Sequence, residues 1–336
     1  MGDPVSDWIH QPIPEKLWHY TSTQGFQGII SSGYIYATDV RFLNDREEFV
    51  HARKIANNLI AESPELGENQ FPFRESLQSA VDAAFGADHL DPNRAQILVA
   101  SFSVSEDDLS QWRGYSHGTS GVSIAFDLRF LRPPVESGTA ATFAPCVYED
   151  SEKKALILSS LQHFVEVSKS KWSEITESFL GQCVPGKPKP DLKEISQFTS
   201  AAFGDTDFKV QLESALKKTR WDLLRIAGLL KHRAFQHERE WRFVLPIAPG
   251  KDKTKLANPI RFRSSSTSIV PYLEFQLAAA FLRNGRNADA IPLLPVNDLI
   301  LGPGSGEDSV NGALALLQSK SIKAIPRKSD VPYRAV

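Results

Sequence analysis

Hydrophobic and polar positions along this chain predict two groups of β-strands separated by a long helical region. Residues 121–127 show the clearest alternation, with Val122, Ile124 and Phe126 on one side, as in a half-buried strand. The first group is expected at residues 17–21, 34–38, 97–103, 121–127 and 141–148, and the second at 240–245, 259–263, 268–275, 299–301 and 322–325. Because these strands are closely spaced with short connections, we expect a mixed, mainly antiparallel sheet.

Helical periodicity marks the remaining segments. Residues 23–32 predict a helix that Gly33 ends. Further helices are expected from Asn44-Asp45 to about Ala61, over 73–85 and near 310–319. From residue 151 to 233 the apolar spacing is helical, and strands resume afterwards. We therefore expect an α+β fold in a single domain, 1–336, that carries a helical insertion at 151–233.

Composition limits the classes of function. The 336 residues are 41% hydrophobic, with a formal net charge of -2, which argues against a general polyanion binder. The net charge does not exclude a local basic groove built from the Lys and Arg residues between Lys217 and Arg233. No apolar run approaches a membrane span, and residues 1–18 lack a secretory signal pattern, so a cytoplasmic protein is expected. Cys146 and Cys183 are far apart in the sequence, which disfavours a cysteine zinc site. Glu48 and His51 have the spacing of a helical metal pair, but a di-iron site would need a second Glu-x-x-His pair, so no metal is expected.

The acid pair Glu238 and Glu240 stands at the start of an aromatic, strand-like run. In a strand these two carboxylates and Arg242 would share one face, while Trp241 and Phe243 would share the other. Paired carboxylates at a strand edge suit a general base or a grip on ribose hydroxyls. They equally suit a surface strand whose acids pair with arginines.

Histidine and hydroxyl groups supply a second set of candidates. His19 lies between aromatics in the first strand, where it either packs as a structural residue or donates to a sugar hydroxyl. Ser101 and Ser103 end a buried strand. Trp112 and Tyr115 follow in a short segment and either line a pocket for a flat ring or cover the core edge.

Several nucleophile and phosphate motifs are absent from the sequence. There is no G-x-S-x-G elbow, no P-loop and no G-x-G-x-x-G fingerprint. The glycine-rich residues 302–306 lack the P-loop spacing, although they precede a predicted helix whose start can hold phosphate weakly.

Motifs spread along most of the chain resemble one bacterial family, which is catalogued as domain of unknown function 2971. That family name implies no activity. The resembling motifs are Trp18-His19-Tyr20-Thr21, Phe42-Leu43-Asn44-Asp45 with Glu48, residues 110–115 before 121–126, residues 238–242, and Pro332-Tyr333-Arg334.

The opening His-Tyr-Thr strand, helix and glycine also resemble the start of ADP-ribosyltransferases, which carry a late catalytic Glu, often in a Glu-x-Glu pair. This resemblance implies an ADP-ribosyltransferase-like fold with NAD as substrate. Glu240 would be catalytic, Glu238 would face the acceptor, and His19 would bind ribose. The residues that would contact NAD are His19, Tyr20, Thr21, Ser101, Ser103, Trp112, Tyr115 and Arg242.

The resulting hypothesis is an NAD-dependent ADP-ribosyltransferase or NAD hydrolase, acting as a toxin or in phage defence. Its acceptor would be a protein or nucleic acid, and an antitoxin or another regulatory partner would fit this role. One alternative is a non-catalytic module that binds a nucleotide or peptide. The other is a Mg²⁺-dependent nuclease using Asp45, Glu48, Glu238 and Glu240.

Overall fold

The computed structural model describes residues 3–43, 46–62, 74–85, 95–115, 120–128, 141–181, 206–247, 259–265, 268–276 and 294–332, with the backbone alone for 46–49, 171–181 and 206. The chain forms two compact units. A helical unit comprises Met1–Val5, Phe49–Asp88 and Asp150–Ala227, and a sheet unit comprises Ser6–Glu48, His89–Glu149 and Gly228–Val336. Asn44, Asp45, Cys183, Tyr333 and Arg334 lie outside the described residues.

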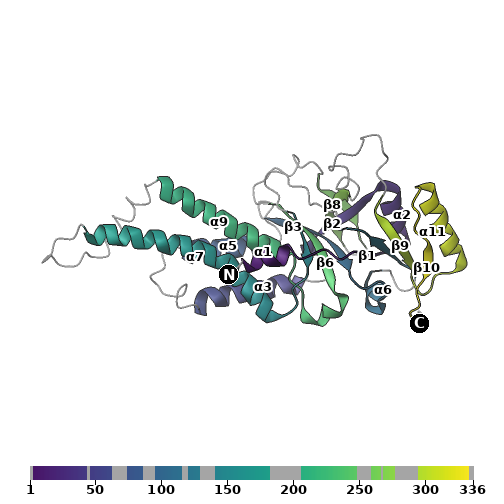
Figure 1. The fold of residues 1–336 in the computed structure, drawn as a ribbon, viewed down its shortest axis with the longest axis horizontal. Helices are drawn as coiled ribbons and strands as arrows, with labels where there is room; N and C mark the ends of the chain where they lie inside the picture. The colour runs from purple at the N-terminus through teal and green to yellow at the C-terminus, as the bar shows by residue number, and fades with distance from the viewer. Residues whose placement is uncertain are drawn as a thin grey trace. The chain divides into compact units, whose positions relative to one another are not determined.

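The helical unit is built from α3 (Arg46–Glu62), α5 (Arg74–Phe85), α7 (Asp150–Gly181) and α9 (Thr206–Ala227). α7 and α9 lie side by side, and α5 packs against α9 (Figure 1). Leu161 and Phe164 supply the buried stripe of α7, and the buried Thr219 hydroxyl of α9 donates to the Ser160 carbonyl at 2.9 Å. The helical insertion expected at 151–233 ends earlier, because α9 stops at Ala227 and the residues from Gly228 onward belong to the sheet unit. The part up to Ala227 shares its unit with α3 and α5.

The sheet unit contains ten described strands in one sheet. They are β1 (Leu17–Thr21), β2 (Tyr34–Asp39), β3 (Gln96–Ser103), β4 (Val122–Phe126), β5 (Thr142–Pro145), β6 (Glu240–Ile247), β7 (Arg261–Ser264), β8 (Ile269–Gln276), β9 (Val296–Leu301) and β10 (Pro326–Lys328). Among these named strands only β9 and β10 pair in parallel. The expectation of an α+β protein with a mixed, mainly antiparallel sheet is confirmed.

The strand order is β10-β9-β4-β1-β3-β2-β8-β7, and β6 pairs with both β3 and β5. β3 is the branch point of this sheet. Along one edge it pairs with β6 over its whole length, and along the other it pairs with β2 at Val99 and with β1 at Ser103. The strands that carry the candidate residues therefore meet around the end of β3.

One expected strand is displaced. Residues 322–325 were expected to be extended, but β10 begins only at Pro326. The physical reason is the end of α11 (Glu307–Ser319): Ser321 has a positive φ of 56°, and the Ile322 amide donates back to the Leu317 carbonyl at 3.0 Å. This turn and its hydrogen bond close the end of α11, so the strand begins only at Pro326.

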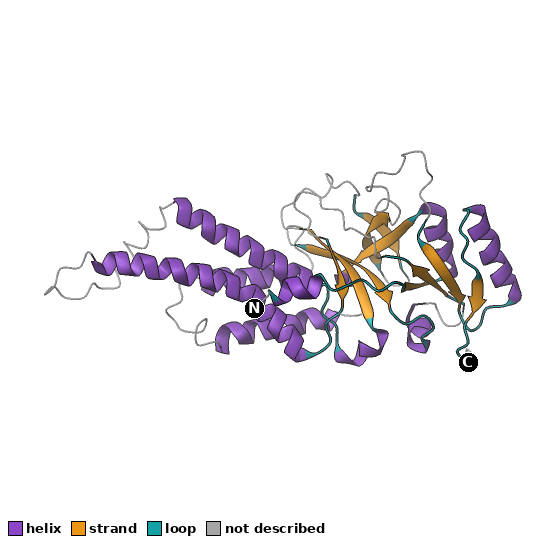
Figure 2. Ribbon diagram, viewed as in Figure 1, coloured by secondary structure: helices purple, strands orange, loops and turns teal. Residues whose placement is uncertain are grey.

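Helices cover the two faces of the sheet differently. α2 (Thr23–Ser32) and α11 lie side by side near β9 and β10 (Figures 1 and 2). Phe26 and Leu317 from these helices join Leu17, Ile124 and Phe126 in the main apolar core. The predicted stop of α2 is confirmed, because Gly33 is left-handed, with a φ of 79°.

The opposite face carries a smaller cluster. α6 (Leu109–Tyr115) places Trp112 there against Trp18, Tyr20, Ala125 and Ile300. We call this side of the sheet the α6 face. Among the helices in the described ranges, none combines the length and the hydrophobicity of a membrane span.

Candidate functional site

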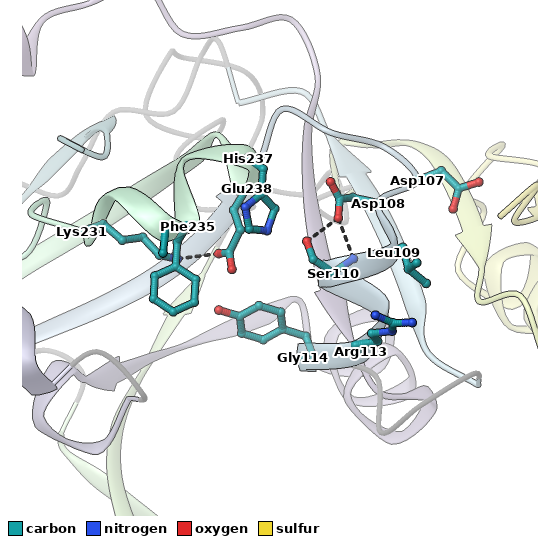
Figure 3. A pocket seen from close by; sticks show the side chains of 12 residues that line it. Asp107, Asp108, Leu109, Ser110, Arg113, Gly114, Lys231, Phe235, His237 and Glu238 are labelled. Carbon is teal, nitrogen blue, oxygen red and sulfur yellow. Dashed lines mark hydrogen bonds and ion pairs between the residues drawn. The ribbon is translucent and has the colours of Figure 1, made fainter. Parts of the chain in front are cut away.

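A cavity of about 760 Å³ lies in the sheet unit between two short helical segments. One wall comes from α6 and the turn before it, and the other from η2 (Arg233–Glu238) and the residue Lys231 (Figure 3). We call it the α6–η2 cavity. Its lining residues are Asp107, Asp108, Leu109, Ser110, Arg113, Gly114, Tyr115, Lys231, Ala234, Phe235, His237 and Glu238.

A tight turn connects η2 to β6. The His232 ring nitrogen Nδ1 accepts the Ala234 amide at 3.1 Å and caps the start of η2. Arg239 ends it in the left-handed region, with φ 42° and ψ 52°, which is uncommon for a residue with a side chain. Glu238 is therefore helical, and the strand alternation that would place it on one face with Glu240 does not apply, because β6 begins at Glu240. The turn at Arg239 still brings Glu238 and Glu240 to one cation.

That cation is Lys231, whose side chain is almost completely buried. Its Nζ lies 2.5 Å from Glu238 Oε2 and also bonds Glu240 Oε2. Arg242 Nε donates to the other Glu240 oxygen, Oε1, at 2.8 Å, and Arg242 Nη1 donates to the Gly228 carbonyl at 3.2 Å. Two acids and two bases thus alternate, which compensates the cost of burying each charge.

The charges of this network fix the protonation states of its two central residues, Glu240 and Lys231. Burial by itself would raise the pKa of Glu240, but Arg242 and Lys231 outweigh burial and lower the pKa to about 2. Burial would lower the pKa of Lys231, but the Glu240 charge outweighs it and raises that pKa. A protonated lysine is no nucleophile, and Glu240 is occupied on both oxygens. Neither residue suits covalent or base catalysis.

Glu238 and Lys231 are the members of the network that line the cavity, and Glu238 is the acid of this pair. It is 8% exposed, and its backbone carbonyl accepts the Ser103 hydroxyl at 2.7 Å. Ser103 in turn accepts the Ser105 amide at 2.9 Å, which ties η2 to the end of β3. Within the described part of the chain, the Glu238 carboxylate is bound by Lys231 alone, and the contact is to Oε2. Oε1 is thus the oxygen available to a ligand.

Two aromatic side chains line the cavity beside Glu238. Tyr115 is 40% exposed and Phe235 is 37% exposed, which is high for rings of this size. The Lys231 ammonium lies 5.2 Å from the centre of the Phe235 ring, at cation–π distance. Although Tyr115 is partly exposed, desolvation of its phenol group, and next the charge of Glu240, raises the pKa of Tyr115, so the phenol is a hydrogen-bond donor at neutral pH.

The opposite wall is held by Tyr20. Its hydroxyl donates to the Ser105 carbonyl at 2.9 Å and accepts the Asp108 amide at 3.0 Å. Asp108 then caps α6 by accepting the Ser110 amide at 2.7 Å. Trp112 is fully buried below this turn. The sequence-predicted residues Tyr20 and Trp112 therefore position the wall and do not line the cavity.

The other sequence-predicted residues divide into two groups. Glu238 and Tyr115 line the cavity, while Ser103, Glu240 and Arg242 lie around Glu238 and fix it. The second group, His19, Thr21 and Ser101, neither lines the cavity nor contacts Glu238 in the described residues.

His19 and Thr21 have contacts elsewhere. His19 Nδ1 bonds the Ser101 carbonyl at 2.9 Å, and burial lowers the pKa of the imidazole, so the ring is neutral and Nδ1 carries the proton. A Cβ added to Gly25 at the start of α2 would lie 2.1 Å from Thr21 Oγ1, so Thr21 packs closely against this helix. Both side chains serve local packing in the described residues.

The expected convergence of His19 and Glu240 in one cleft is not found. Trp18 pairs with Ser103, and Ser103 pairs with Glu240, so these three side chains share the α6 face. His19 follows Trp18 and points to the other face, where its ring lies 5.6 Å from that of Phe102. The alternation of the strand separates the two groups.

Lys231, Phe235 and His237 line the cavity although no sequence motif pointed to them. The lysine directly follows the apolar residues 226–230, and two acids follow it within nine positions. A buried acid pair requires a nearby cation, which is the one signal that points to Lys231.

The segment that supplies most of this site has a counterpart among protein families. Residues 111–243 match the family model described as "Protein of unknown function (DUF2971)". The match supports the likeness to this family that the sequence motifs indicated. It includes Tyr115, Lys231, Glu238, Glu240 and Arg242. Searches of curated proteins and of solved structures gave no match.

The described residues contain no group of three or more His, Cys, Asp or Glu side chains arranged to hold a metal ion. Two acids of the nuclease hypothesis are untested by this observation, because Asp45 and the side chain of Glu48 lie outside the described residues.

Proposed function

We propose that the protein binds NAD in the α6–η2 cavity and breaks the bond between nicotinamide and ribose, passing ADP-ribose to an acceptor or to water. The observation that carries this proposal is the placement of Glu238. It is a cavity-lining carboxylate, fixed through one oxygen by Lys231 and through its backbone by Ser103, beside two exposed aromatic rings.

The chemistry requires a fixed negative group. When the bond breaks, its electron pair leaves with nicotinamide, and the ribose passes through an oxocarbenium-like state. Glu238 Oε1 accepts a hydrogen bond from the ribose 2-hydroxyl and stabilises the positive charge of that state. One preorganised group of this kind contributes about 3–4 kcal/mol, or ~10²–10³ in rate.

The remaining lining residues suit the rest of NAD. Tyr115 and Phe235 offer flat surfaces for the nicotinamide ring, and Arg113 brings positive charge to the side of the diphosphate. A volume of about 760 Å³ is within the usual range for small-molecule sites. In this proposal Glu240 is a positioning residue and His19 has no role in the cavity.

The test is nicotinamide release from NAD by the purified full chain, followed by chromatography. Wild type is expected to release nicotinamide, Glu238→Gln to be slower by ~10²–10³, and the exposed Glu307→Gln to match wild type. No release by wild type, or equal release by Glu238→Gln, contradicts the proposal. Thermal stabilisation by NAD without turnover would instead support the binding-module alternative.

A further inference from the structure

A second candidate surface lies at the other end of the same sheet, on β2, β8 and the edge strand β7. Tyr36 is directly opposite Glu274, and Thr38 is opposite Tyr272, which is in turn opposite Arg261. Cross-strand partners share a face, and alternate residues along each strand return to it. We call this surface the tyrosine–arginine face. Its residues are Tyr34, Tyr36, Arg261, Arg263, Tyr272 and Glu274.

Tyr36 presents an aromatic ring to solvent on this face. It is 44% exposed, although its neighbours Ile35 and Ala37 are fully buried on the other side of the strand. Its ring centre lies 4.2 Å from that of Tyr272, with the ring planes 35° apart. Tyr272 thus supports the ring of Tyr36 from one side, and the core does not need Tyr36.

Two arginines extend the same face. Arg261 has more than half of its side chain exposed and contacts Glu274 at 3.2 Å. Arg263 is exposed, and its Nη2 donates to the Thr38 hydroxyl at 3.3 Å. These bonds hold both guanidinium groups over the sheet beside the tyrosines. A guanidinium has five N–H donors, so each arginine keeps donors for an anion.

We infer that the tyrosine–arginine face binds single-stranded nucleic acid. Exposed rings on a sheet stack with unpaired bases, and arginines beside them bind the phosphates of the same strand. A duplex hides the faces of its bases, so it cannot use Tyr36. The chain's net charge of -2 gives no general affinity for polyanions, so binding depends on this local arrangement.

The test uses the full chain and fluorescence anisotropy with labelled ten-nucleotide RNA, DNA of the same sequence, and the corresponding DNA duplex. At least one single strand is expected to bind ten times more tightly than the duplex. Tyr36→Ala is expected to weaken binding about tenfold, the loss of one stacked base, whereas Tyr36→Phe keeps the ring and the affinity. Arg263→Ala is expected to reduce the salt slope by about 0.7.

Matched controls separate this surface from the rest of the sheet unit. Arg327→Ala removes a partly exposed arginine of β10 that pairs with Glu106, and it is expected to leave affinity unchanged. Glu238→Gln is expected to do the same, because the cavity is a different site. The inference would be overturned if neither single strand bound, if the duplex bound with equal affinity, or if Tyr36→Ala left the affinity unchanged. Should Tyr36→Ala fail to fold, unchanged affinity in Arg261→Ala/Arg263→Ala would overturn it.

Discussion

Lys231 and Glu238 form an ion pair of 2.5 Å in which the lysine side chain is 1% exposed and the carboxylate borders a cavity. The same ammonium bonds Glu240, which Arg242 binds from the other side. A charge buried to this degree is tolerated only while its partners are present. The network therefore sets both the stability of this region and the position of Glu238.

Replacement of Lys231 by methionine is expected to destabilise the protein by about 3–5 kcal/mol, because it leaves two carboxylates near each other without their shared cation. Urea denaturation measures this change. Lys16→Met is the matched control. Lys16 is half exposed, and its Nζ lies 3.7 Å from Asp298 Oδ2. Ion pairs near the surface contribute about 0–1 kcal/mol. Equal losses in the two variants would show that the Lys231 network is not stabilising.

Acid is expected to weaken the fold through Glu240. Burial would raise its pKa, but Arg242 and Lys231 prevail and lower it to about 2, against an ordinary 4.5. A carboxyl with a lowered pKa contributes stability above its unfolded value, and this contribution is lost as the pH falls from about 4.5 to about 2. The thermal midpoint of wild type should fall more steeply over that interval than that of Glu240→Gln.

Glu307→Gln is the control for this measurement, because its side chain is exposed. It should retain the wild-type slope. Parallel curves for wild type and Glu240→Gln would mean that Glu240 does not hold its charge through the network.

Gly228 is expected to resist substitution. A Cβ at this position would lie 2.5 Å from Val244 Cγ1 and 3.1 Å from Ile97 Cγ2, and the Gly228 carbonyl also accepts Arg242. Gly228→Ala should cost about 1–3 kcal/mol in urea denaturation, because β-branched neighbours in a packed sheet cannot easily move.

The matched control is Gly312→Ala in α11. A Cβ there meets nothing within 4 Å, and alanine favours a helix interior over glycine by about 0.5–1 kcal/mol. This variant should be slightly more stable than wild type. Destabilisation by both changes to a similar degree would contradict the steric argument.

Local patterns predicted much of the sheet unit and part of the site. The alternation of Val122, Ile124 and Phe126 identified β4, Gly33 marked the end of α2, and the acids at 238 and 240 indicated a charged centre. The displaced β10 was less predictable, because it depends on how the last turn of α11 closes at Ser321.

What the sequence by itself determined is therefore the set of elements, the mainly antiparallel sheet and the acid pair, since these follow from residue types a few positions apart. Tertiary structure alone decided that Glu238 borders the cavity and that Glu240 does not. It also decided that His19 and Glu240 point to opposite faces. The physical reason is strand register. The pairing of Trp18 with Ser103 joins segments that are distant in the sequence, and a shift of that register by one residue would move every side chain of the strand to the opposite face. Lys231 meets its acids only because Arg239 turns the chain between them.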